Sequence, residues 1–577
     1  MTDVASLRPL AAVLVSVVAI PLILGSHGRP NLREAWTMLA ALTKVAIVGS
    51  MVPGVLSGTV YVTDLGTIVA DVGFVLRVDA LGLLFGLLAS ALWVVTSLYS
   101  IGYMRGLSEH NQTRYFASFA ASLATAIGVA FASNLVTLFI FYELLTVATY
   151  PLVAHDETDE ARAAGRKYLA YTFIGGVAVL TGTLLVYFLT GTTAFSAGGI
   201  ADLATADPAL ARLAFGLLAG GFGVKAALMP VHSWLPDAMV APTPVSGLLH
   251  AVAVVKSGVF GIARVTLDVF GPETVQDLGV GLPLAAVAAF TLLTASVIAL
   301  RQDNLKRRLA YSTISQLSYI VLGLGVLSGD AIVGGLLHIP AHAFMKLTLF
   351  FCAGAIHVET HTDDISDMAG IGKRMPLTMT AFAIAAAGMA GIPLVAGFVS
   401  KWYLLIGSVD AGQAVFAIAL LVSGMLNIAY FWPIVYQAFF ESEDEDDHDS
   451  KPLLEGSFGG RFAVADRATA SEPAAVRADG GDEAEAGDDH AESADSGHDE
   501  TDADDHHDAA ADHDHHHGGP PEGGWERVGW RGGESTWFML GPILTAAAGA
   551  VALGVVPAAA VFLQIVQLVA ENVGVVA

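Results

Sequence analysis

The stretch GFGVKAALMPVHSWLPDAMV, residues 221–240, sets one lysine, Lys225, in an apolar run and follows it with two prolines, Pro230 and Pro236. A lysine at bilayer depth costs about 2.5–3.5 kcal/mol on insertion scales. Proline removes a backbone donor and pushes the residue before it out of the helical region. Because broken helices are tolerated within a membrane where they line a cavity, the stretch indicates a membrane helix that breaks beside a polar space.

The composition assigns most of the chain to the membrane. Of its 577 residues, 54% are hydrophobic and only 14% are charged, which is too little polar surface for a water-soluble protein of this length. The single cysteine, Cys352, excludes a disulfide framework and a cysteine metal cluster. We therefore expect an all-α polytopic membrane protein.

Apolar spans of bilayer length recur along the chain. We place fourteen transmembrane helices near residues 9–25, 36–56, 79–104, 115–133, 135–154, 168–190, 210–230, 243–267, 280–300, 309–327, 331–358, 376–407, 413–440 and 537–570. The first follows one arginine and no A-x-A cleavage site, so we expect a membrane helix rather than a signal peptide. Between the second and third, β-branched residues around Asp and Gly turns at 59–79 predict an extramembrane hairpin.

Basic residues are distributed unevenly between the loops. With the N-terminus outside, the loops that face the cytoplasm hold 13 Lys and Arg residues, and the outer segments hold four. This bias follows the positive-inside rule and predicts the orientation. Residues 441–535, which hold 29 acidic and 6 basic side chains, then lie in the cytoplasm.

The acidic segment 441–535 has too little apolar content to fold alone, so we expect it to be disordered. Its histidine-rich stretch ADHDHHH (511–517) combines imidazole and carboxylate groups, which bind divalent ions. No spacing there fixes a coordination geometry, so a solvated acidic linker is favoured and we assign no metal site.

Ionisable side chains within the spans are the main functional signal. Such residues usually face a bundle interior or a water-filled path for ions or protons. Glu143 is the lone carboxylate in a core span, and it must be protonated, solvated or paired. A static ion pair is the alternative for each group, and Lys44 is also long enough to snorkel. Five of the nine lysines lie in spans: Lys44, Lys225, Lys256, Lys346 and Lys401.

The stretch HIPAHAFMKLTLF (338–350) places His338, His342 and Lys346 at i, i+4 and i+8. They share one helix face about 12 Å long. Histidine titrates near neutrality, so three titratable groups in a row predict a proton path. His250 and Lys256 share the eighth span, but six residues place them about 120° apart around a helix.

A second break follows in MAGIPLVAGFVSKW (389–402), where Gly391 and Pro393 precede Lys401. Two broken spans in corresponding places predict a transport site between inverted repeats. We expect two inverted five-helix repeats, helices 4–8 and 9–13, with helices 7 and 12 broken. The expected domains are 1–110 with the hairpin, 111–270 and 271–440 as the repeats, 441–535 as the insertion and 536–577 as the last helix.

Several of these motifs resemble one known superfamily. They are FYELLTVATYPLV (141–153), HSWLPDA (232–238) with VKSG (255–258), HAFMKLTLFF (342–351) and AGFVSKW (396–402). They resemble the antiporter-like subunits shared by Mrp-type multisubunit sodium/proton antiporters, respiratory complex I and membrane hydrogenases, and look most similar to the D-type subunit of the Mrp antiporters. The resemblance implies fourteen helices, inverted repeats and a central polar axis.

The resemblance also implies roles for individual residues. It pairs Glu143 with Lys225, makes Lys256 and the histidines His232, His250, His338 and His342 a relay that includes Lys346, and makes Lys401 the terminal charge of the second half. The expected protein is therefore a cell-membrane subunit of a multisubunit Na⁺/H⁺ antiporter. It has other membrane subunits as partners, no nucleic acid partner, no cofactor and no enzymatic activity of its own.

Two other functions stay open. A proton-translocating subunit of a complex I-like quinone or hydrogenase complex would share the same buried charges. Because the chain has no cysteine cluster or nucleotide fingerprint, any redox chemistry would lie on partner subunits. An inert membrane scaffold is the third class, and the charges within the spans argue against it.

Overall fold

Long apolar helices make up most of the molecule, because a backbone polar group in lipid must find its partner within its own segment. A computed structural model describes residues 2–69, 72–441, 519–521, 524–529, 533–557 and 561–575. The predicted disorder of the acidic segment and its histidine-rich stretch 511–517 falls largely outside these residues. In the described part, twelve helical segments are long and apolar enough to cross a membrane, which confirms the all-α polytopic class.

Eleven of these segments are single helices or helices with a short extension. They are α1 (Arg8–Gly25), α2 and α3 (Pro30–Gly49 and Val52–Leu56), α4 (Ala80–Gly106), α5 (Gln112–Phe131), α6 (Leu135–Val153), α7 (Asp159–Thr190), α13 (Gly281–Ala299), α14 (Leu305–Val326), α15 (Gly329–Thr360), α18 (Ala414–Phe440) and α19 (Trp537–Val555). The twelfth is composite, with α10 (Thr243–Gly247), η3 (Leu248–Val252), α11 (Val254–Arg264) and η4 (Val265–Val269).

The remaining predicted spans also coincide with helices. They are α8 (Pro208–Lys225), α16 (Pro376–Ala390) with α17 (Ala396–Asp410), and α20 (Val561–Asn572), which follows α19 within the last span. Short helices connect the long ones: α9 (Trp234–Asp237), α12 (Pro272–Asp277), η1 (Ala201–Ala204), η2 (Ala238–Val240), η5 (Ile365–Asp367) and η6 (Ile371–Lys373). The count of fourteen membrane crossings and the inverted repeats stay predictions.

A small sheet lies at one end of the helices. Its strands are β1 (Thr2–Ala5), β2 (Thr59–Val69) and β3 (Val72–Val78), in the order β1-β2-β3. β2 and β3 form an antiparallel hairpin in which Tyr61 pairs with Val78, and β1 runs parallel to β2. The β-branched residues of 59–79 thus pair as strands.

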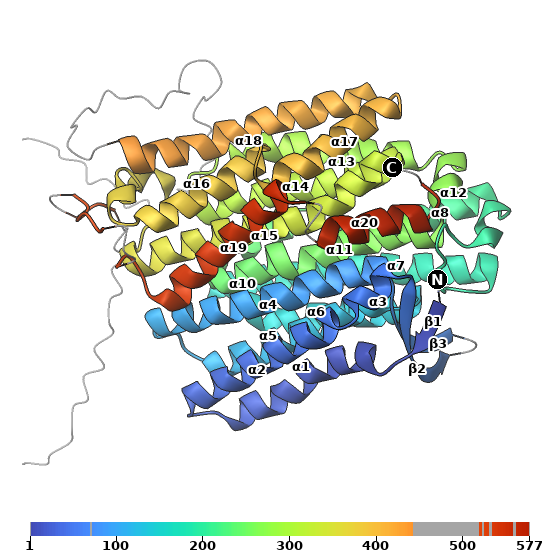
Figure 1. Cartoon of the computed structure of the whole chain (residues 1–577), viewed down its shortest axis with the longest axis horizontal. Helices are drawn as coiled ribbons and strands as arrows, with labels where there is room; N and C mark the ends of the chain where they lie inside the picture. The colour runs from blue at the N-terminus through green and yellow to red at the C-terminus, as the bar shows by residue number, and fades with distance from the viewer. Residues whose placement is uncertain are drawn as a thin grey trace, which may run out of the picture. The chain divides into compact units, whose positions relative to one another are not determined.

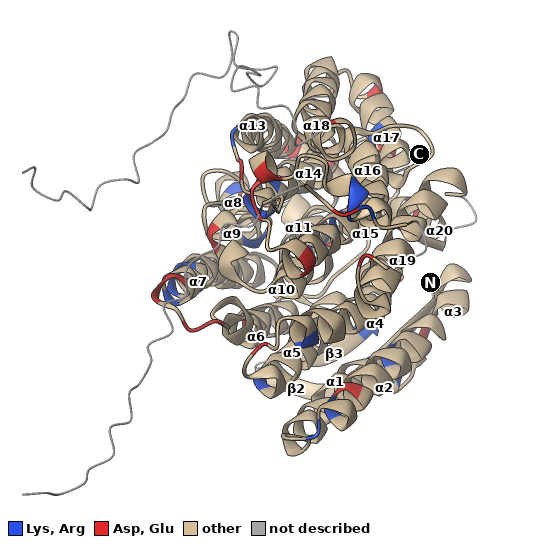
Figure 2. Ribbon diagram, turned by 90° about the vertical axis from the view of Figure 1, so that its left-hand side faces the viewer, with Lys and Arg blue, Asp and Glu red and all other residues tan. Residues whose placement is uncertain are grey.

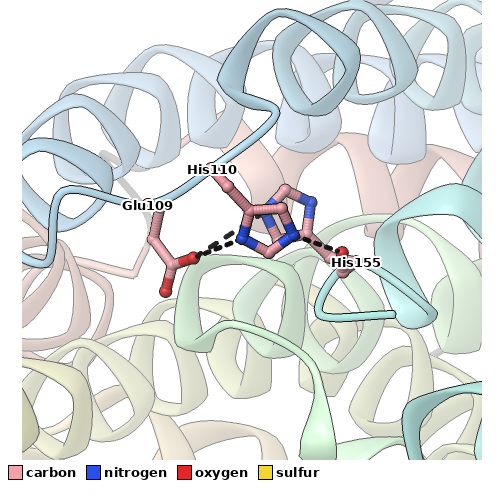
Figure 3. Close-up of side chains that lie close together, drawn as sticks. All are labelled: Glu109, His110 and His155. Atoms are coloured by element: carbon pink, nitrogen blue, oxygen red, sulfur yellow. Dashed lines mark hydrogen bonds and ion pairs between the residues drawn. The ribbon is translucent and has the colours of Figure 1, made fainter. Parts of the chain in front are cut away.

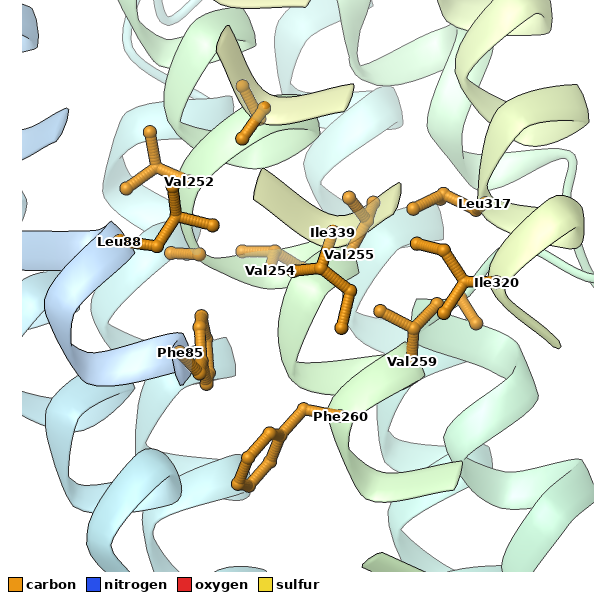
Figure 4. Close-up of a cluster of buried hydrophobic side chains, with 14 of the residues drawn as sticks. Phe85, Leu88, Val252, Val254, Val255, Val259, Phe260, Leu317, Ile320 and Ile339 are labelled. Carbon is orange, nitrogen blue, oxygen red and sulfur yellow. The ribbon is translucent and has the colours of Figure 1, made fainter. Parts of the chain in front are cut away.

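The composite span and α15 form the centre of the bundle. Figure 1 shows the long helices side by side, with α10, α11 and α15 between the N-terminal helices and α16 to α18. Every residue of the composite span is buried, and so are 26 of the 32 residues of α15, against 6 of the 18 residues of α1. Figure 4 shows the apolar cluster there, with Phe85 and Leu88 of α4, Val254, Val259 and Phe260 of α11, Leu317 and Ile320 of α14 and Ile339 of α15.

The helix breaks fall next to two of the candidate lysines. α8 ends at Lys225, and the carbonyl freed at Val224 accepts a hydrogen bond from Trp234 Nε1 at 2.8 Å. α16 ends before Gly391, whose φ of +92° belongs to the left-handed region that glycine adopts without strain. Lys225 therefore ends its helix before the break, while Lys401 lies in the helix after its own break.

The composite span has an interruption that the sequence analysis missed. Residues 248–252 form a π-helical turn, and Ala253 then leaves the helical region with φ −121° and ψ −67°. Single π turns inside α-helices occur frequently at functional sites. Here the turn contains His250, and Ala253 lies between the turn and α11, which carries Lys256.

The described residues at the end of the acidic segment contact the helices. Glu534 is almost fully buried, and its carboxylate accepts hydrogen bonds from the backbone N–H groups of Leu377 and Thr378 at 2.9 and 2.8 Å. A carboxylate at a helix N-terminus is favoured by the unpaired N–H groups and the helix dipole. Glu534 thereby fastens this segment to the start of α16.

Candidate functional site

Charged residues are sparse on the helices, as Figure 2 shows by the few blue and red segments on a mostly uncharged ribbon. Lys44, Lys225, Lys256 and Lys346 are fully buried, while Lys401 is half-buried. Burying a charged group is costly unless it has partners. The partners of each lysine therefore indicate its role.

Lys256 of α11 and His342 of α15 contact each other directly. Lys256 Nζ lies 2.8 Å from His342 Nδ1, and both side chains are fully buried. An ammonium group can only donate, so in the charged state of the lysine the His342 ring accepts at Nδ1 and carries its proton on Nε2. The pair joins the composite span to α15, two of the three most buried helical segments in the described part of the chain.

His338 lies one turn from His342, and their ring centroids are 6.1 Å apart. Both His338 nitrogens have neutral partners: Nδ1 is 2.8 Å from Ser400 Oγ, and Nε2 is 2.9 Å from Gln316 Oε1. A neutral histidine needs one donor and one acceptor, which the hydroxyl and the amide oxygen supply. His338 is thus positioned by α14 and α17 together.

Lys401 of α17 is close to this histidine through Tyr319 of α14. Its Nζ donates to the carbonyl of Met389 at 2.5 Å and lies 4.8 Å from the centroid of the Tyr319 ring. The same ring stacks on His338 with a centroid distance of 5.4 Å. Contacts therefore link five residues in the order Lys256, His342, His338, Tyr319 and Lys401, all buried except the half-buried Lys401. We call this series the central axis.

A branch leaves the central axis along α15. Lys346 Nζ donates to the carbonyl of Leu309 at 3.1 Å and to the hydroxyl of Ser312. His250 is close enough to interact electrostatically with both Lys346 and His342. Neither ring nitrogen of His250 has a hydrogen-bond partner among the described residues, although the ring packs against Phe350 at 4.8 Å.

Glu143 and Lys225 do not form a direct ion pair in this structure. Lys225 Nζ instead donates to the carbonyl of Tyr142 at 2.5 Å and lies 3.4 Å from the centroid of that tyrosine ring. Glu143 is half-buried beside Gly176, and the two charges are close enough to interact electrostatically. Consecutive helix residues point about 100° apart, so Tyr142 rather than Glu143 faces Lys225.

Two other candidates lie apart from the central axis. His232 is half-buried after the first break, and its ring is 6.4 Å from that of Tyr311. Lys44 does not snorkel: its Nζ donates to the carbonyl of Leu123 at 3.0 Å and lies 4.9 Å from the Trp93 ring. These contacts give Lys44 a structural role that joins α2 to α5.

The site also contains neutral polar residues that were not among the residues predicted from the sequence. Gln316, Tyr319, Ser312 and Ser400 contact the buried histidines and lysines, yet each is an ordinary polar residue by itself. Their spacing is the sequence feature that could have identified them, because Ser312, Gln316 and Tyr319 lie at i, i+4 and i+7 on one face of α14.

A buried ion cluster near the sheet forms a separate feature. Arg264 Nη1 lies 2.7 Å from Asp79 Oδ2 and 2.7 Å from Asp268 Oδ2, and Asp79 also caps α4 through the N–H of Gly82. An arginine paired with two carboxylates is a compensated buried charge. It connects the start of α4 to the end of the composite span and has a structural role.

The fold and the central axis define a class of protein, a polytopic membrane protein with an internal series of lysine and histidine side chains. The comparison with known families then gives the family. The chain belongs to the family described as NADH:quinone oxidoreductase/Mrp antiporter, TM, whose model matches residues 132–427, just over half of the chain. This confirms the resemblance indicated by the motifs.

Curated relatives include both branches of that family. The chain is 37% identical over 358 residues to NADH-quinone oxidoreductase subunit N of Desulforudis audaxviator, covering 60% of this chain and 68% of the relative. It is 32% identical over 396 residues to the putative antiporter subunit mnhA2 of Staphylococcus haemolyticus, covering 65% of this chain and 48% of the relative. The chain thus spans about half the length of that antiporter protein.

Two solved structures share the fold. A chain of the Mrp complex from Dietzia sp. DQ12-45-1b matches with a TM-score of 0.74 over 99% of this chain and 98% of its own length, at 22% identity. A chain of the archaeal membrane-bound sulfane sulfur reductase matches with a TM-score of 0.68 over 75% of this chain and 88% of its own, at 25% identity.

Proposed function

We propose that the chain is a membrane subunit of a multisubunit monovalent cation/proton antiporter of the Mrp type, similar to its D-type subunit. It moves protons along Glu143, Lys225, His232, Lys256, His250, His342, His338, Lys346 and Lys401 in exchange for cytoplasmic Na⁺. The observation that carries the proposal is the direct contact of Lys256 Nζ with His342 Nδ1 at 2.8 Å within fully buried helices.

The geometry supports a stepwise transfer. Charged Lys256 donates to His342 Nδ1, so transfer of that proton leaves a neutral amine and an imidazolium. Nε2 has no protein partner among the described residues, so the imidazolium passes the proton of Nε2 to a water molecule in the path, which restores the neutral ring with its proton on Nδ1. A charge on Lys401 or Lys346 biases the step because like charges repel in a low-dielectric interior.

The test measures exchange in vesicles that contain the complete complex. Na⁺ is added to vesicles with an imposed proton gradient, and a pH-sensitive dye reports proton movement. We expect His342→Ala to lower the rate about 100-fold, since a positioned acid–base group contributes about 10²–10⁴. Lys373→Ala, at an exposed lysine between α15 and α16, is the control and should leave the rate unchanged. A wild-type rate in His342→Ala would exclude the central axis from transport.

The second candidate function is a proton-translocating subunit of a redox complex. The match to a quinone oxidoreductase subunit, which covers 68% of that relative, favours it. Identifying the proteins that purify with the chain separates the two functions. Small membrane antiporter subunits support the leading proposal, and iron–sulfur or dehydrogenase subunits support the second.

A further inference from the structure

Three potential metal ligands from two connections meet beside the end of α6. Glu109 and His110 belong to the connection between α4 and α5, and His155 follows α6. One ligand atom from each residue lies within 4.8 Å of the others. Glu109 Oε2 is 3.6 Å from His110 Nδ1 and 3.9 Å from His155 Nε2. Figure 3 shows the two rings stacked next to the carboxylate.

His155 is the unusual member of this group. Its side chain is fully buried, and neither ring nitrogen has a hydrogen-bond partner among the described residues. A buried polar group without a partner costs about 1–3 kcal/mol. A ligand bound to the His155 ring would remove this cost.

His110 is oriented for coordination. Its Nε2 lies 3.1 Å from the carbonyl oxygen of His155, and because a carbonyl only accepts, Nε2 carries the proton. The lone pair of the neutral ring is then on Nδ1, the atom that faces Glu109. A metal-binding histidine nearly always donates its other N–H to a carbonyl or carboxylate in this way.

The surroundings favour a cation. Asp156 lies close enough to Glu109 to interact with it electrostatically, which places a second carboxylate beside the three ligands. The positive charge of Arg114 is offset by Glu157, with which it forms an ion pair. A bound dication would therefore be stabilised by the carboxylates beside it.

We propose that Glu109, His110 and His155 bind one divalent transition-metal ion of the Zn²⁺ class, with water in the fourth position. Zinc accepts imidazole and carboxylate ligands at about 2.0–2.2 Å, which separates two tetrahedral ligand atoms by about 3.3 Å. Two of the separations are 3.6 and 3.9 Å and the third is at most 4.8 Å, so binding would draw the side chains together by up to about 1.5 Å. The ion would fasten the α4–α5 connection to the end of α6, the helix that carries Glu143.

The test is a Zn²⁺ titration of the full chain in its purified complex, with a chromophoric chelator as competitor. Histidines at 511–517 are present in every sample, so the comparison between variants isolates this site. We expect His110→Ala and Glu109→Gln each to lose one tight Zn²⁺ equivalent. His361→Ala, which removes an exposed histidine after α15, should retain it.

A second measurement uses Co²⁺ in place of Zn²⁺. A tetrahedral site gives visible absorption bands, and these should be present in the wild type and His361→Ala and absent in Glu109→Gln, which preserves the shape of the side chain. Equal Zn²⁺ stoichiometry and affinity in wild type, His110→Ala and Glu109→Gln would overturn the proposal.

Discussion

Lys225 is held by a carbonyl and an aromatic ring rather than by a carboxylate. A desolvated cation over an aromatic face gains about 2 kcal/mol, and the Tyr142 carbonyl adds a charge-assisted hydrogen bond at 2.5 Å. The lysine is therefore positioned without Glu143, whose charge is left to act through space. Lys225 is therefore a charge at the end of α8 that is not bound to a carboxylate.

At this residue scale we predict that Lys225→Ala abolishes cation-driven proton movement in vesicles containing the full complex. The variant removes the only charge at the end of α8. Tyr142→Phe is the matched control: it keeps the ring and the carbonyl and loses only the hydroxyl contact to Gly221, so it should retain most of the rate. Exchange at the wild-type rate in Lys225→Ala would reject a transport role for this lysine.

At the scale of elements, the break between α16 and α17 depends on one glycine. Gly391 has φ +92°, and a Cβ there would also lie 3.0 Å from Lys401 Cδ. A side chain in the left-handed region costs about 1–2 kcal/mol. The break therefore fixes both the end of α16 and the position of the lysine.

We predict that Gly391→Ala lowers the melting temperature of the purified complex, in line with a loss of about 1–2 kcal/mol. Gly424→Ala is the control, since its added Cβ would meet the carbonyl of Ala390 at an ordinary 3.6 Å. A thermal-shift measurement compares the two. If Gly391→Ala melted with the wild type, the left-handed conformation would not be required for this break.

Sequence reasoning succeeded where helical periodicity determines the outcome. His338, His342 and Lys346 share a buried face of α15 because i, i+4 spacing alone places them there. Contacts between different elements could not be predicted from the sequence. Nothing in the sequence showed that Tyr142 would replace Glu143 beside Lys225, or that His155 would meet His110 from another connection.

At the scale of the whole molecule, four connections predicted to face the cytoplasm meet at one end. Glu109 after α4 interacts electrostatically with Asp156 after α6, Asp156 with Lys306 at the start of α14, and Lys306 with Asp363 after α15. Shared contacts require these connections to lie on the same side. This arrangement agrees with the prediction that these connections share one side of the membrane, and which side that is stays a prediction.

We predict that a membrane-impermeant maleimide applied to intact cells labels Thr205→Cys and leaves Glu160→Cys and Ser457→Cys unlabelled until the membrane is opened. Thr205 and Glu160 are exposed on connections predicted to lie on opposite sides, and the native Cys352 is buried and silent. Labelling of Ser457→Cys in intact cells would place the acidic segment outside.

The two points where the acidic segment leaves and rejoins the helices lie next to each other. Gln437 near the end of α18 accepts a hydrogen bond from the N–H of Gly370, and Trp525 donates to the carbonyl of Ala369. Doubling the length of a loop between fixed ends costs only about 0.6 kcal/mol in closure entropy. Additional chain inserted at this position therefore costs the fold little free energy. An added domain or a fluorescent reporter could be placed here without altering the helices that hold the central axis.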